Sequence, residues 1–447
     1  MKKLLSIIVT KIIILFLKFK NKGSSFPGKI ALKIYPDILK HVSKNVETIL
    51  ITGTNGKTTT TALTNHIFNN AFIDCFSNST GANMLTGIVT TYIKNYNLFN
   101  RKISKTAIIE VDEASLKHVC KYIQPKIIAV TNIFRDQLDR YGEVYTTLNH
   151  IKEGIKLCSN SKLILNGDEP LLCSLEKVYN NKFFFGFDNF KSDENTKNLN
   201  VEAKNCKFCG ETYTYNFITY NHLGDFKCNN CGFKREKLDF SIADILENNI
   251  NESIIKIKNN VITINQGGIY NIYNVLCAYA ISTVCSIPDY IVIDSIKSFS
   301  KVFGRQENFK IKSNSITMFL VKNPAGFNET LNTINLDKNS EMSIGFLLND
   351  NFADGQDVSW IYDVNLEMIK NFNIKELFTG GIRTHDMSLR LNLTEIEKPI
   401  NTFEKYEDIL KYLESKENET IYILCSYTCM LEFRKFLYNK NYLDVVW

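Results

Sequence analysis

NVETILITGTNGKTTTT, residues 45–61, places a glycine-bracketed turn directly after a short apolar run. The run ILI predicts a buried strand, and the threonine-rich text after the turn predicts a helix. Glycines at such a junction let backbone N–H groups approach a polyphosphate at the amino end of the helix. Lys57 can neutralise β- and γ-phosphate oxygens, and Thr58 can offer its hydroxyl to Mg2+. The predicted nucleotide-binding residues are Gly53, Thr54, Asn55, Gly56, Lys57, Thr58 and Thr59.

The length and composition limit the class of protein. A chain of 447 residues is too long for one ordinary core, so two or three domains are expected. Its net charge of +6 is compatible with nucleotides or membrane surfaces as partners, but it is too weak to argue for nucleic acid. Twelve cysteines are too sparse for a disulfide scaffold, and four have metal-ligand spacing, so a reducing cytoplasm is expected.

Strand-like runs alternate with helix-forming stretches after the leader. The run at 46–52 precedes a helical stretch at 58–71, the run at 105–112 precedes one at 114–123, and a third run spans 126–132. This βαβ rhythm predicts an α/β fold with a mostly parallel sheet and with ligands at the carboxyl ends of the strands.

Breaks in this rhythm suggest the domain limits. We predict a helical leader at 1–44, a central ATP-binding domain at 45–300 with an insert at 200–236, and a smaller C-terminal α/β domain at 301–447. The Asn-, Lys- and Glu-rich text at 188–204 has the composition of a linker into the insert.

The first residues, MKKLLSIIVTKIIILFLKFKNKG, begin like a secretory signal but lack a small-residue cleavage site. Their apolar run from Leu4 to Leu17 is broken by polar residues and is shorter than a membrane-spanning helix requires. We expect a helix that packs on the protein or lies on the inner membrane surface. The basic flank of Lys18, Lys20, Lys22 and Lys29 keeps the membrane-surface alternative open.

Further elements follow the loop in a characteristic order. They are IIEVDEAS at 108–115, TNIFRDQLDRYG at 131–142, LILNGDEP at 163–170, GGIYNIYNVLCAYA at 267–280 and FGRQE at 303–307. On these elements and the G-T-N-G-K-T loop, residues 45–310 resemble the Mur ligase superfamily. The resemblance implies transfer of the γ-phosphoryl group of ATP to a carboxylate, followed by attack of an amine on the acyl phosphate. Such chemistry needs fixed cations and oriented N–H donors around anionic oxygens.

The resemblance also assigns roles to individual residues. It implies that Glu110 binds Mg2+ together with Thr58, and that Lys57 and Glu110 are catalytic. It implies adenine contacts from Asn271 and, less directly, Asn274. Arg305 and Glu307 match the G-R-x-E element that precedes the last domain, and Arg305 is expected to bind the nucleotide.

Several positions depart from the superfamily pattern. Gln137 and Tyr141 stand where relatives carry histidines, and Gln137 can still offer an oxygen to a metal. Lys152 lies where many relatives carry a carbamylated lysine, although an ordinary helix lysine fits equally. Lys322 replaces the histidine of an H-N-P element, which argues against an ordinary amino acid as the incoming nucleophile.

Two C-x2-C-G motifs supply Cys206 with Cys209 and Cys228 with Cys231. Four thiolates at this spacing can fill a tetrahedral Zn2+ shell and leave no open position, so we predict a structural zinc site. The aromatic residues between the pairs suit a small β ribbon: Tyr213, Tyr215, Phe217, Tyr220 and Phe226. The segment between the pairs has no lysine or arginine from Gly210 to Phe226, which argues against nucleic acid as its partner.

A Mur-type site with this insert resembles the MurT family of lipid II isoglutaminyl synthase subunits. The segments VKNPAGFNETL, LLNDNFADGQDVSWIYD, GGIRTHDMSLRL and YTCMLEFR carry the resemblance to the end of the chain. It implies amidation of the α-carboxyl of D-glutamate in the stem peptide of lipid II, with ammonia supplied by a GatD-like glutamine amidotransferase partner. An aspartate of the last domain is expected to orient the partner's histidine. Among Asp350, Asp354, Asp357 and Asp363 we favour Asp357, although a plain turn or cap aspartate is the alternative.

Three other hypotheses are open from the sequence. A stand-alone ligase could add an amino acid to a carboxylate, and a zinc-ribbon ATP-binding module could act on nucleic acid. The chain could also be its own glutaminase through Cys425 or Cys429 with His385, but these cysteines fit core positions better. Thr80 and Asn83 in STGANMLTG are weaker candidates for contact with substrate or metal.

Overall fold

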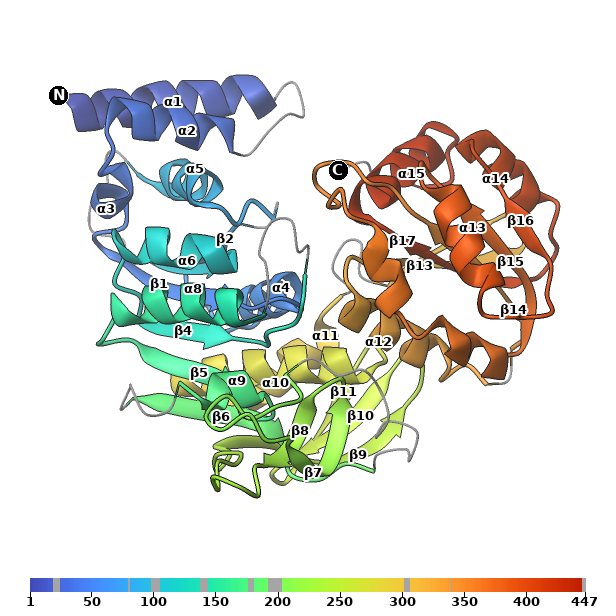
Figure 1. The fold of residues 1–447 in the computed structure, drawn as a ribbon. Helices are drawn as coiled ribbons and strands as arrows, with labels where there is room; N and C mark the ends of the chain where they lie inside the picture. Colours follow the sequence, from blue (N-terminus) through green and yellow to red (C-terminus); the bar gives the residue numbers. More distant parts are fainter. Residues whose placement is uncertain are drawn as a thin grey trace.

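The computed structural model describes residues 1–18, 25–78, 81–97, 105–136, 144–175, 181–191, 203–300, 306–338 and 340–443. Figure 1 shows two α/β units, each built around its own sheet, which meet near α10, α11 and α12. The predicted α/β class is confirmed. The predicted limits of the domains stay a prediction.

The larger sheet runs in the order β11-β10-β9-β6-β5-β4-β1-β3-β2 in the described part of the chain. Its strands are β1 (Val46–Thr52), β2 (Cys75–Ser77), β3 (Lys105–Glu110), β4 (Ile127–Val130), β5 (Lys162–Asn166), β6 (Lys182–Phe187), β9 (Phe240–Asn248), β10 (Ser253–Ile257) and β11 (Asn260–Ile264). All neighbouring strands in the part β9-β6-β5-β4-β1-β3-β2 pair in parallel. Strand β10 pairs antiparallel with both β9 and β11. The parallel pairing brings the carboxyl ends of β1, β3 and β4 to one edge of the sheet.

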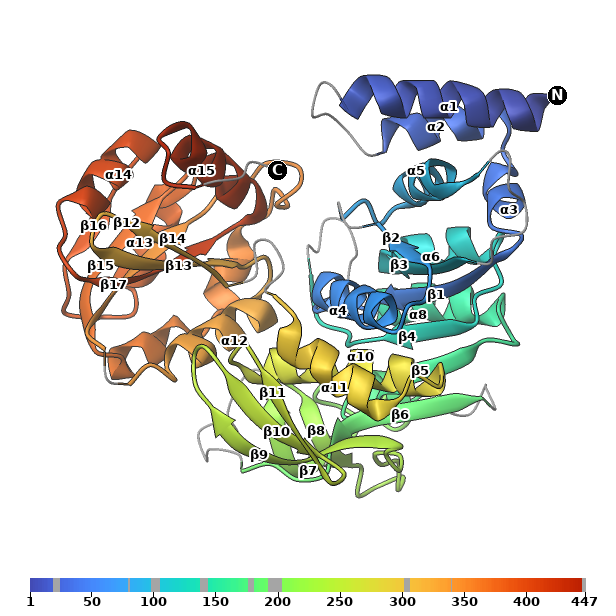
Figure 2. The ribbon, with the colours of Figure 1, turned by 180° about the vertical axis from the view of Figure 1, so that it is seen from behind.

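Helices cover both faces of this sheet, as Figures 1 and 2 show from opposite sides. On β1, Ile49 and Ile51 join the apolar cluster of one face, and Leu50 joins that of the other. This explains why the strand is apolar without alternation, since a parallel strand is buried on both sides. One face carries α4 (Lys57–Asn70), α10 (Ile269–Val284) and α11 (Asp289–Ser298); the other carries α5 (Leu85–Asn95), α6 (Glu113–Cys120), α8 (Val144–Lys156) and α9 (Pro170–Cys173).

The second unit has a sheet in the order β12-β13-β17-β14-β15-β16 over the residues described. Its strands are β12 (Glu307–Ile311), β13 (Asn314–Leu320), β14 (Met342–Leu347), β15 (Ile374–Gly380), β16 (Ile400–Thr402) and β17 (Thr420–Cys425). Its helices are α12 (Pro324–Ile334), η3 (Ser359–Asp363), η4 (Leu366–Asn371), α13 (Thr384–Asn392), α14 (Tyr406–Glu414) and α15 (Tyr427–Asn439). Apolar clusters lie on both faces of this sheet, so it has its own core.

The cysteine insert folds as a two-stranded antiparallel ribbon of β7 (Thr214–Tyr220) and β8 (Leu223–Lys227). This confirms the ribbon predicted from its aromatic residues. Tyr213 and Phe226 join one apolar cluster of the central unit, and Phe217 and Tyr220 join the other. The insert is therefore packed into the central unit rather than standing apart from it.

The leader forms α1 (Lys2–Lys18), α2 (Phe26–Ile34) and α3 (Ile38–Val42). Helix α1 packs on α2 and α5 and lies at the outer edge of the molecule in both views (Figures 1 and 2). Over the described ranges, none of the helices combines the length and the apolar character that crossing a bilayer requires.

Candidate active site

The loop between β1 and α4 depends on two glycines with positive φ. Gly53 has φ of 121° and Gly56 has φ of 86°, a region that residues with a Cβ rarely adopt. A Cβ on Gly53 would lie 2.3 Å from Thr131 Oγ1, and one on Gly56 would lie 1.9 Å from Asn274 Oδ1. The two glycines thus let the backbone turn tightly into the amino end of α4, where the N–H groups can bind an anion.

Side chains that follow β4 hold this loop in place. Asn132 Oδ1 accepts a hydrogen bond from Asn55 N at 2.8 Å, and Asn132 Nδ2 donates to Asn55 O at 3.1 Å. Thr131 Oγ1 donates to the same carbonyl at 2.7 Å. These bonds join two neighbouring carboxyl ends of the sheet and so hold the backbone of the loop.

Lys57 lies in a buried acidic cluster. Its Nζ donates to Glu113 Oε1 at 3.0 Å and to the carbonyl oxygen of Gly53 at 2.5 Å. Burial lowers the pKa of Lys57, but the charges of Glu113, Glu110 and Asp112 outweigh burial and raise it. Burial raises the pKa of Glu113, and the neighbouring charge of Asp112 adds to this, although Lys57 and Lys322 act in the opposite direction. The cluster therefore carries an excess of negative charge that favours cations.

Glu110 and Thr58 lie together, as the resemblance to Mur ligases implied, and their binding of Mg2+ stays a prediction. Thr58 Oγ1 donates to Glu110 Oε2 at 2.9 Å, and Asn83 Nδ2 donates to Glu110 Oε1 at 2.9 Å. The backbone of Glu110 exchanges two hydrogen bonds with the side chain of Asn78. A carboxylate and a hydroxyl held side by side at a helix amino end offer the oxygen ligands that Mg2+ prefers.

The second unit meets the loop through residues at the start of α12. Asn323 and Asn55 exchange side-chain hydrogen bonds of 3.0 and 3.3 Å. Lys322 Nζ lies 2.6 Å from Asp136 Oδ2, so its charge is directed to the central unit. The position that departs from the H-N-P element therefore faces the nucleotide-binding loop across the two units.

A cavity lies where the loop, α10 and α12 meet. It is lined by Asn55, Gly56, Asn274, Lys322 and Glu329, among others. Glu329 is 5% exposed, and burial raises its pKa to about 8. Of the two predicted adenine-reading residues, Asn274 lines this cavity.

Asn271 is turned toward its own helix. It is buried, and its Nδ2 donates to Gly267 O at 2.7 Å. Its predicted contact with adenine stays a prediction.

Glu307, from the element that follows α11, makes a bidentate pair with Arg434, with both distances at 2.7 Å, and so ties β12 to α15. Arg305 lies outside the described residues.

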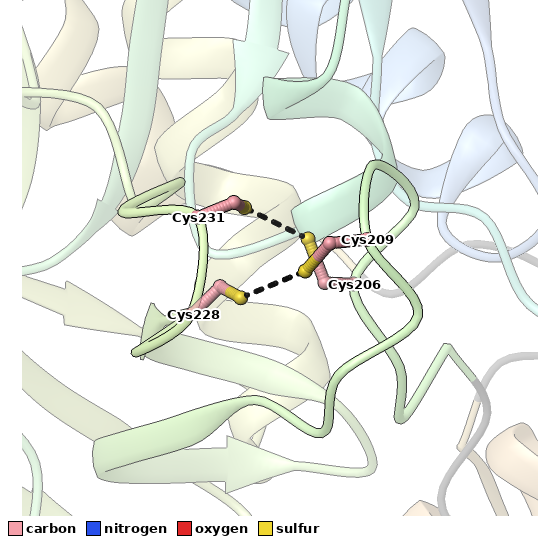
Figure 3. A group of neighbouring side chains, drawn as sticks. All are labelled: Cys206, Cys209, Cys228 and Cys231. Carbon is pink, nitrogen blue, oxygen red and sulfur yellow. Dashed lines mark hydrogen bonds between the residues drawn. The ribbon is translucent and has the colours of Figure 1, made fainter.

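The four insert cysteines converge on one point (Figure 3). Their sulfur atoms all lie within 4.8 Å of one another, with Cys206 and Cys231 at 3.5 Å and Cys209 and Cys228 at 3.4 Å. A tetrahedral shell with Zn–S bonds of about 2.3 Å requires sulfur separations of about 3.8 Å, so the cluster fits a metal ion. Burial raises the pKa of Cys206, but N–H groups of Phe208 and Cys209 outweigh it and set that pKa to about 7.

A buried network joins the insert to the strand ends. His222, in the turn between β7 and β8, lies 2.7 Å from Glu169 Oε2, and both side chains are fully buried. Glu169 also accepts a hydrogen bond from Ile133 N. Arg235 forms an ion pair of 2.8 Å with the buried Asp168. Asp168 also accepts a hydrogen bond from Tyr273 Oη. The insert thus supports the LILNGDEP turn after β5 from outside.

The candidate aspartates of the second unit have different surroundings. Asp357 is exposed and accepts a hydrogen bond from Ser359 N at 2.8 Å. The side chain and then the backbone N–H of Ser359 lower the pKa of Asp357. Asp354 is 5% exposed and accepts bonds from the backbone and hydroxyl of Thr428 at the start of α15. Asp350 pairs with Arg383 at 3.4 Å, and Asp363 pairs with Arg135 at 3.2 Å. Asp357 is thus a turn aspartate that is accessible to a partner, and its role stays a prediction.

The residues of the self-contained glutaminase hypothesis are engaged elsewhere. Cys425 and Cys429 are buried, and burial raises the pKa of Cys429 to about 12. Cys429 contacts Tyr406 Oη at 3.3 Å, whereas the exposed His385 lies 3.3 Å from Glu404. A protonated core thiol is a poor nucleophile, so this geometry argues against the hypothesis.

Lys152 lies half-buried on α8. The pKa of Lys207 in the insert is lowered by burial and, to a smaller extent, by the nearby charge of Lys152. Its carbamylation stays a prediction. Thr80, Gln137 and Tyr141 lie outside the described residues, so their predicted contacts are not placed.

Comparison with known proteins assigns both units. Residues 51–232 match the model of the Mur ligase middle domain, and residues 320–430 match that of the MurT ligase C-terminal domain. The chain is 39% identical over 426 residues to the protein named lipid II isoglutaminyl synthase (glutamine-hydrolyzing) subunit MurT of Streptococcus pneumoniae (strain ATCC BAA-255 / R6), covering 94% of each chain. The chain belongs to the MurT family. Another MurT protein, from Staphylococcus aureus (strain COL), is 35% identical over 388 residues and covers 85% of each chain.

Solved structures confirm the Mur ligase fold of this MurT family member. A pseudomurein peptide ligase type C from Methanothermus fervidus superposes with a TM-score of 0.68 at 22% identity, over 91% of this chain and 81% of that chain. The MurF ligase from Thermotoga maritima in complex with ADP superposes with a TM-score of 0.62 at 15% identity, over 92% of this chain and 85% of that chain. At these identities the likeness shows the fold alone.

Several residues of the site were not predicted from the sequence. Glu113 lies in the quoted segment IIEVDEAS, but only Glu110 was selected from it. Asn132 and Asp136 lie in TNIFRDQLDRYG, and Asn323 lies in VKNPAGFNETL. Their presence in family elements was the available signal, but their contacts join segments far apart in the chain.

Proposed function

We propose that the chain is the ATP-dependent subunit of a lipid II isoglutaminyl synthase. It would amidate the α-carboxyl of D-glutamate in the stem peptide of lipid II and so produce D-isoglutamine for peptidoglycan synthesis. Membership of the MurT family supports this reaction. The observation that carries the proposal is the assembly of Lys57, Thr58 and Glu110 around a preformed anion-binding loop.

The loop and Lys57 would bind the polyphosphate of ATP. Backbone N–H groups at the amino end of α4 point to where an anion binds. Lys57 Nζ donates to Gly53 O, Thr54 O and Glu113 Oε1, so its positive charge is held within the loop, where it would attract phosphate oxygens. When bound, ATP supplies the phosphoryl group that turns the substrate carboxylate into an acyl phosphate.

Mg2+ would lie beside Thr58 and Glu110. Their oxygens already touch, and Asn83 fixes the second oxygen of Glu110. The excess of carboxylates around Lys57 is the charge pattern that a divalent cation would balance. The cysteine cluster would hold Zn2+ as a structural ion, since its four sulfurs leave no open position.

The second unit would receive ammonia from a GatD-like glutamine amidotransferase. Ammonia displaces phosphate from the acyl phosphate without needing a pocket for an amino-acid side chain. Lys322 stands where amino-acid-adding relatives carry a histidine. It forms an ion pair with Asp136 of the central unit, which is compatible with a different incoming nucleophile. Asp357 is accessible on this unit and would orient the partner's histidine. The reaction would take place in the cytoplasm, at the inner face of the membrane that holds the lipid-linked substrate.

Reconstitution tests the proposal. The chain is purified with a candidate glutaminase and supplied with lipid II, ATP and glutamine, and the stem peptide is analysed by mass spectrometry. We expect the OH of the α-carboxyl to be exchanged for NH2, and this exchange should require both subunits. It should be lost in Lys57→Met and kept in the control Lys94→Met, which alters an exposed lysine. Consumption of ATP with addition of an amino acid instead of an amide would overturn the proposal.

A further inference from the structure

Helix α1 exposes a continuous apolar stripe along its length. Its members recur three or four residues apart, which places them on one face of the helix. They are between 41% and 63% exposed: Leu4, Leu5, Ile8, Ile12, Leu15 and Phe16. A stripe of this length on one helix is larger than the scattered apolar residues expected on a surface, so it indicates an interaction site.

The opposite face of α1 is fixed to the protein. Ser6, Ile7 and Thr10 are buried, and Ser6 Oγ donates to Ala31 O of α2 at 3.0 Å. The helix therefore cannot insert end-on without losing these contacts. It can instead lie in a plane with its stripe facing outward, as its place at the edge of the molecule allows (Figures 1 and 2).

The charge around the stripe points to an anionic partner. Residues 1–36 contain lysines but no aspartate or glutamate, and the first acidic residue is Asp37. The lysines are Lys2, Lys3, Lys11, Lys18, Lys20, Lys22, Lys29 and Lys33. Lys2, Lys3, Lys29 and Lys33 are exposed in the structure. A second copy of the chain would bring these like charges together, which disfavours self-association through the stripe.

We propose that α1 is a membrane-surface helix that inserts its stripe into the headgroup region of an anionic bilayer. Apolar insertion and lysine attraction to anionic lipid act together in helices of this kind. Helix α1 is linked to the site through α5, because α1 packs on α5 and Asn83, just before α5, donates to Glu110. This inference deepens the membrane location proposed above. Its test needs no catalysis, so each can fail without the other.

Vesicle flotation of the full chain tests the surface. Vesicles of phosphatidylcholine alone are compared with vesicles that also contain phosphatidylglycerol. We expect binding to the anionic vesicles that weakens at high salt, because the lysine attraction is screened. The triple variant Ile8→Ser, Ile12→Ser, Leu15→Ser should bind at least about tenfold more weakly, because it removes apolar insertion.

Matched variants separate this surface from general effects. The control Ile382→Ser, Leu389→Ser, Leu393→Ser alters three exposed apolar residues at and around α13 and should bind as the parent does. The variant Lys2→Glu, Lys3→Glu keeps the stripe and should lose the preference for anionic vesicles. Equal binding by the stripe variant and the parent would overturn the proposal. The proposal would also be overturned if the parent did not bind vesicles but formed a dimer in sedimentation, and if the stripe variant abolished that dimer.

Discussion

Replacing Lys57 by methionine separates its structural role from its chemical role. The Lys57 and Glu113 side chains are 9% and 6% exposed, with 3.0 Å between Nζ and Oε1. Removing one partner of a buried pair typically costs about 3–5 kcal/mol, because the other charge stays buried and uncompensated. We expect Lys57→Met to lower the free energy of unfolding by this amount near neutral pH.

The pH dependence of the loss follows from Glu113. Burial already raises the pKa of Glu113 above its ordinary value of 4.5, and losing Lys57 raises it further. A carboxyl with a raised folded-state pKa is stable in its protonated form below the unfolded-state pKa, and that stability is lost as the pH rises through the folded-state pKa. The deficit of Lys57→Met should therefore be largest near neutral pH and shrink toward pH 4.5.

The double variant Lys57→Met, Glu113→Gln completes the experiment. It removes both charges, so we expect it to recover most of the lost stability in urea denaturation followed by circular dichroism. Amidation by the reconstituted complex should stay absent in both variants, because neither has the cation that we propose binds the phosphates of ATP. A pH-independent deficit in the single variant, or amidation by the double variant, would refute this reasoning.

Three further predictions concern other parts of the chain. The proposed zinc ion of the cysteine cluster should be lost in Cys209→Ser, with a lower thermal midpoint, as measured by elemental analysis and calorimetry. Cys285→Ser, outside the cluster, should change neither quantity, and an unchanged metal content in Cys209→Ser would contradict the prediction. Burial raises the pKa of Glu329 to about 8, so its ionisation should cost stability as the pH rises from 4.5 to about 8, by up to about 5 kcal/mol, and urea denaturation of Glu329→Gln should lack this loss. Asp357→Asn should abolish glutamine-dependent amidation by the complex but keep amidation with added ammonia, whereas Asp350→Asn should keep both; equal behaviour of the two variants would exclude the role of Asp357.

Local patterns predicted much of this structure. The segment at 45–61 predicted a strand, a glycine-dependent turn and a helix, because each follows from residues adjacent in the chain. The two C-x2-C-G motifs predicted the sulfur cluster for the same reason. The pairing of Thr58 with Glu110 was implied by the resemblance to Mur ligases, and the parallel strands place both residues at one edge of the sheet.

Contacts between distant segments could not be predicted in this way. Lys322 and Asp136 are brought together only by the docking of the second unit, and Asn55 and Asn323 meet for the same reason. Asn274 rather than Asn271 lines the cavity, a difference of one helical turn that depends on how α10 is rotated. The leader is apolar on more than one side, so only packing shows that Ile7 is buried and Ile12 exposed.

Oxygen transfer tests the central claim, that ATP activates the substrate carboxylate before ammonia attacks. Lipid II labelled with oxygen-18 in the α-carboxyl of D-glutamate is amidated by the reconstituted complex, and the inorganic phosphate is analysed by mass spectrometry. If the carboxylate oxygen attacks the γ-phosphorus and leaves with phosphate, each amide formed should yield one phosphate that carries one labelled oxygen. Amide formation with unlabelled phosphate would contradict the account.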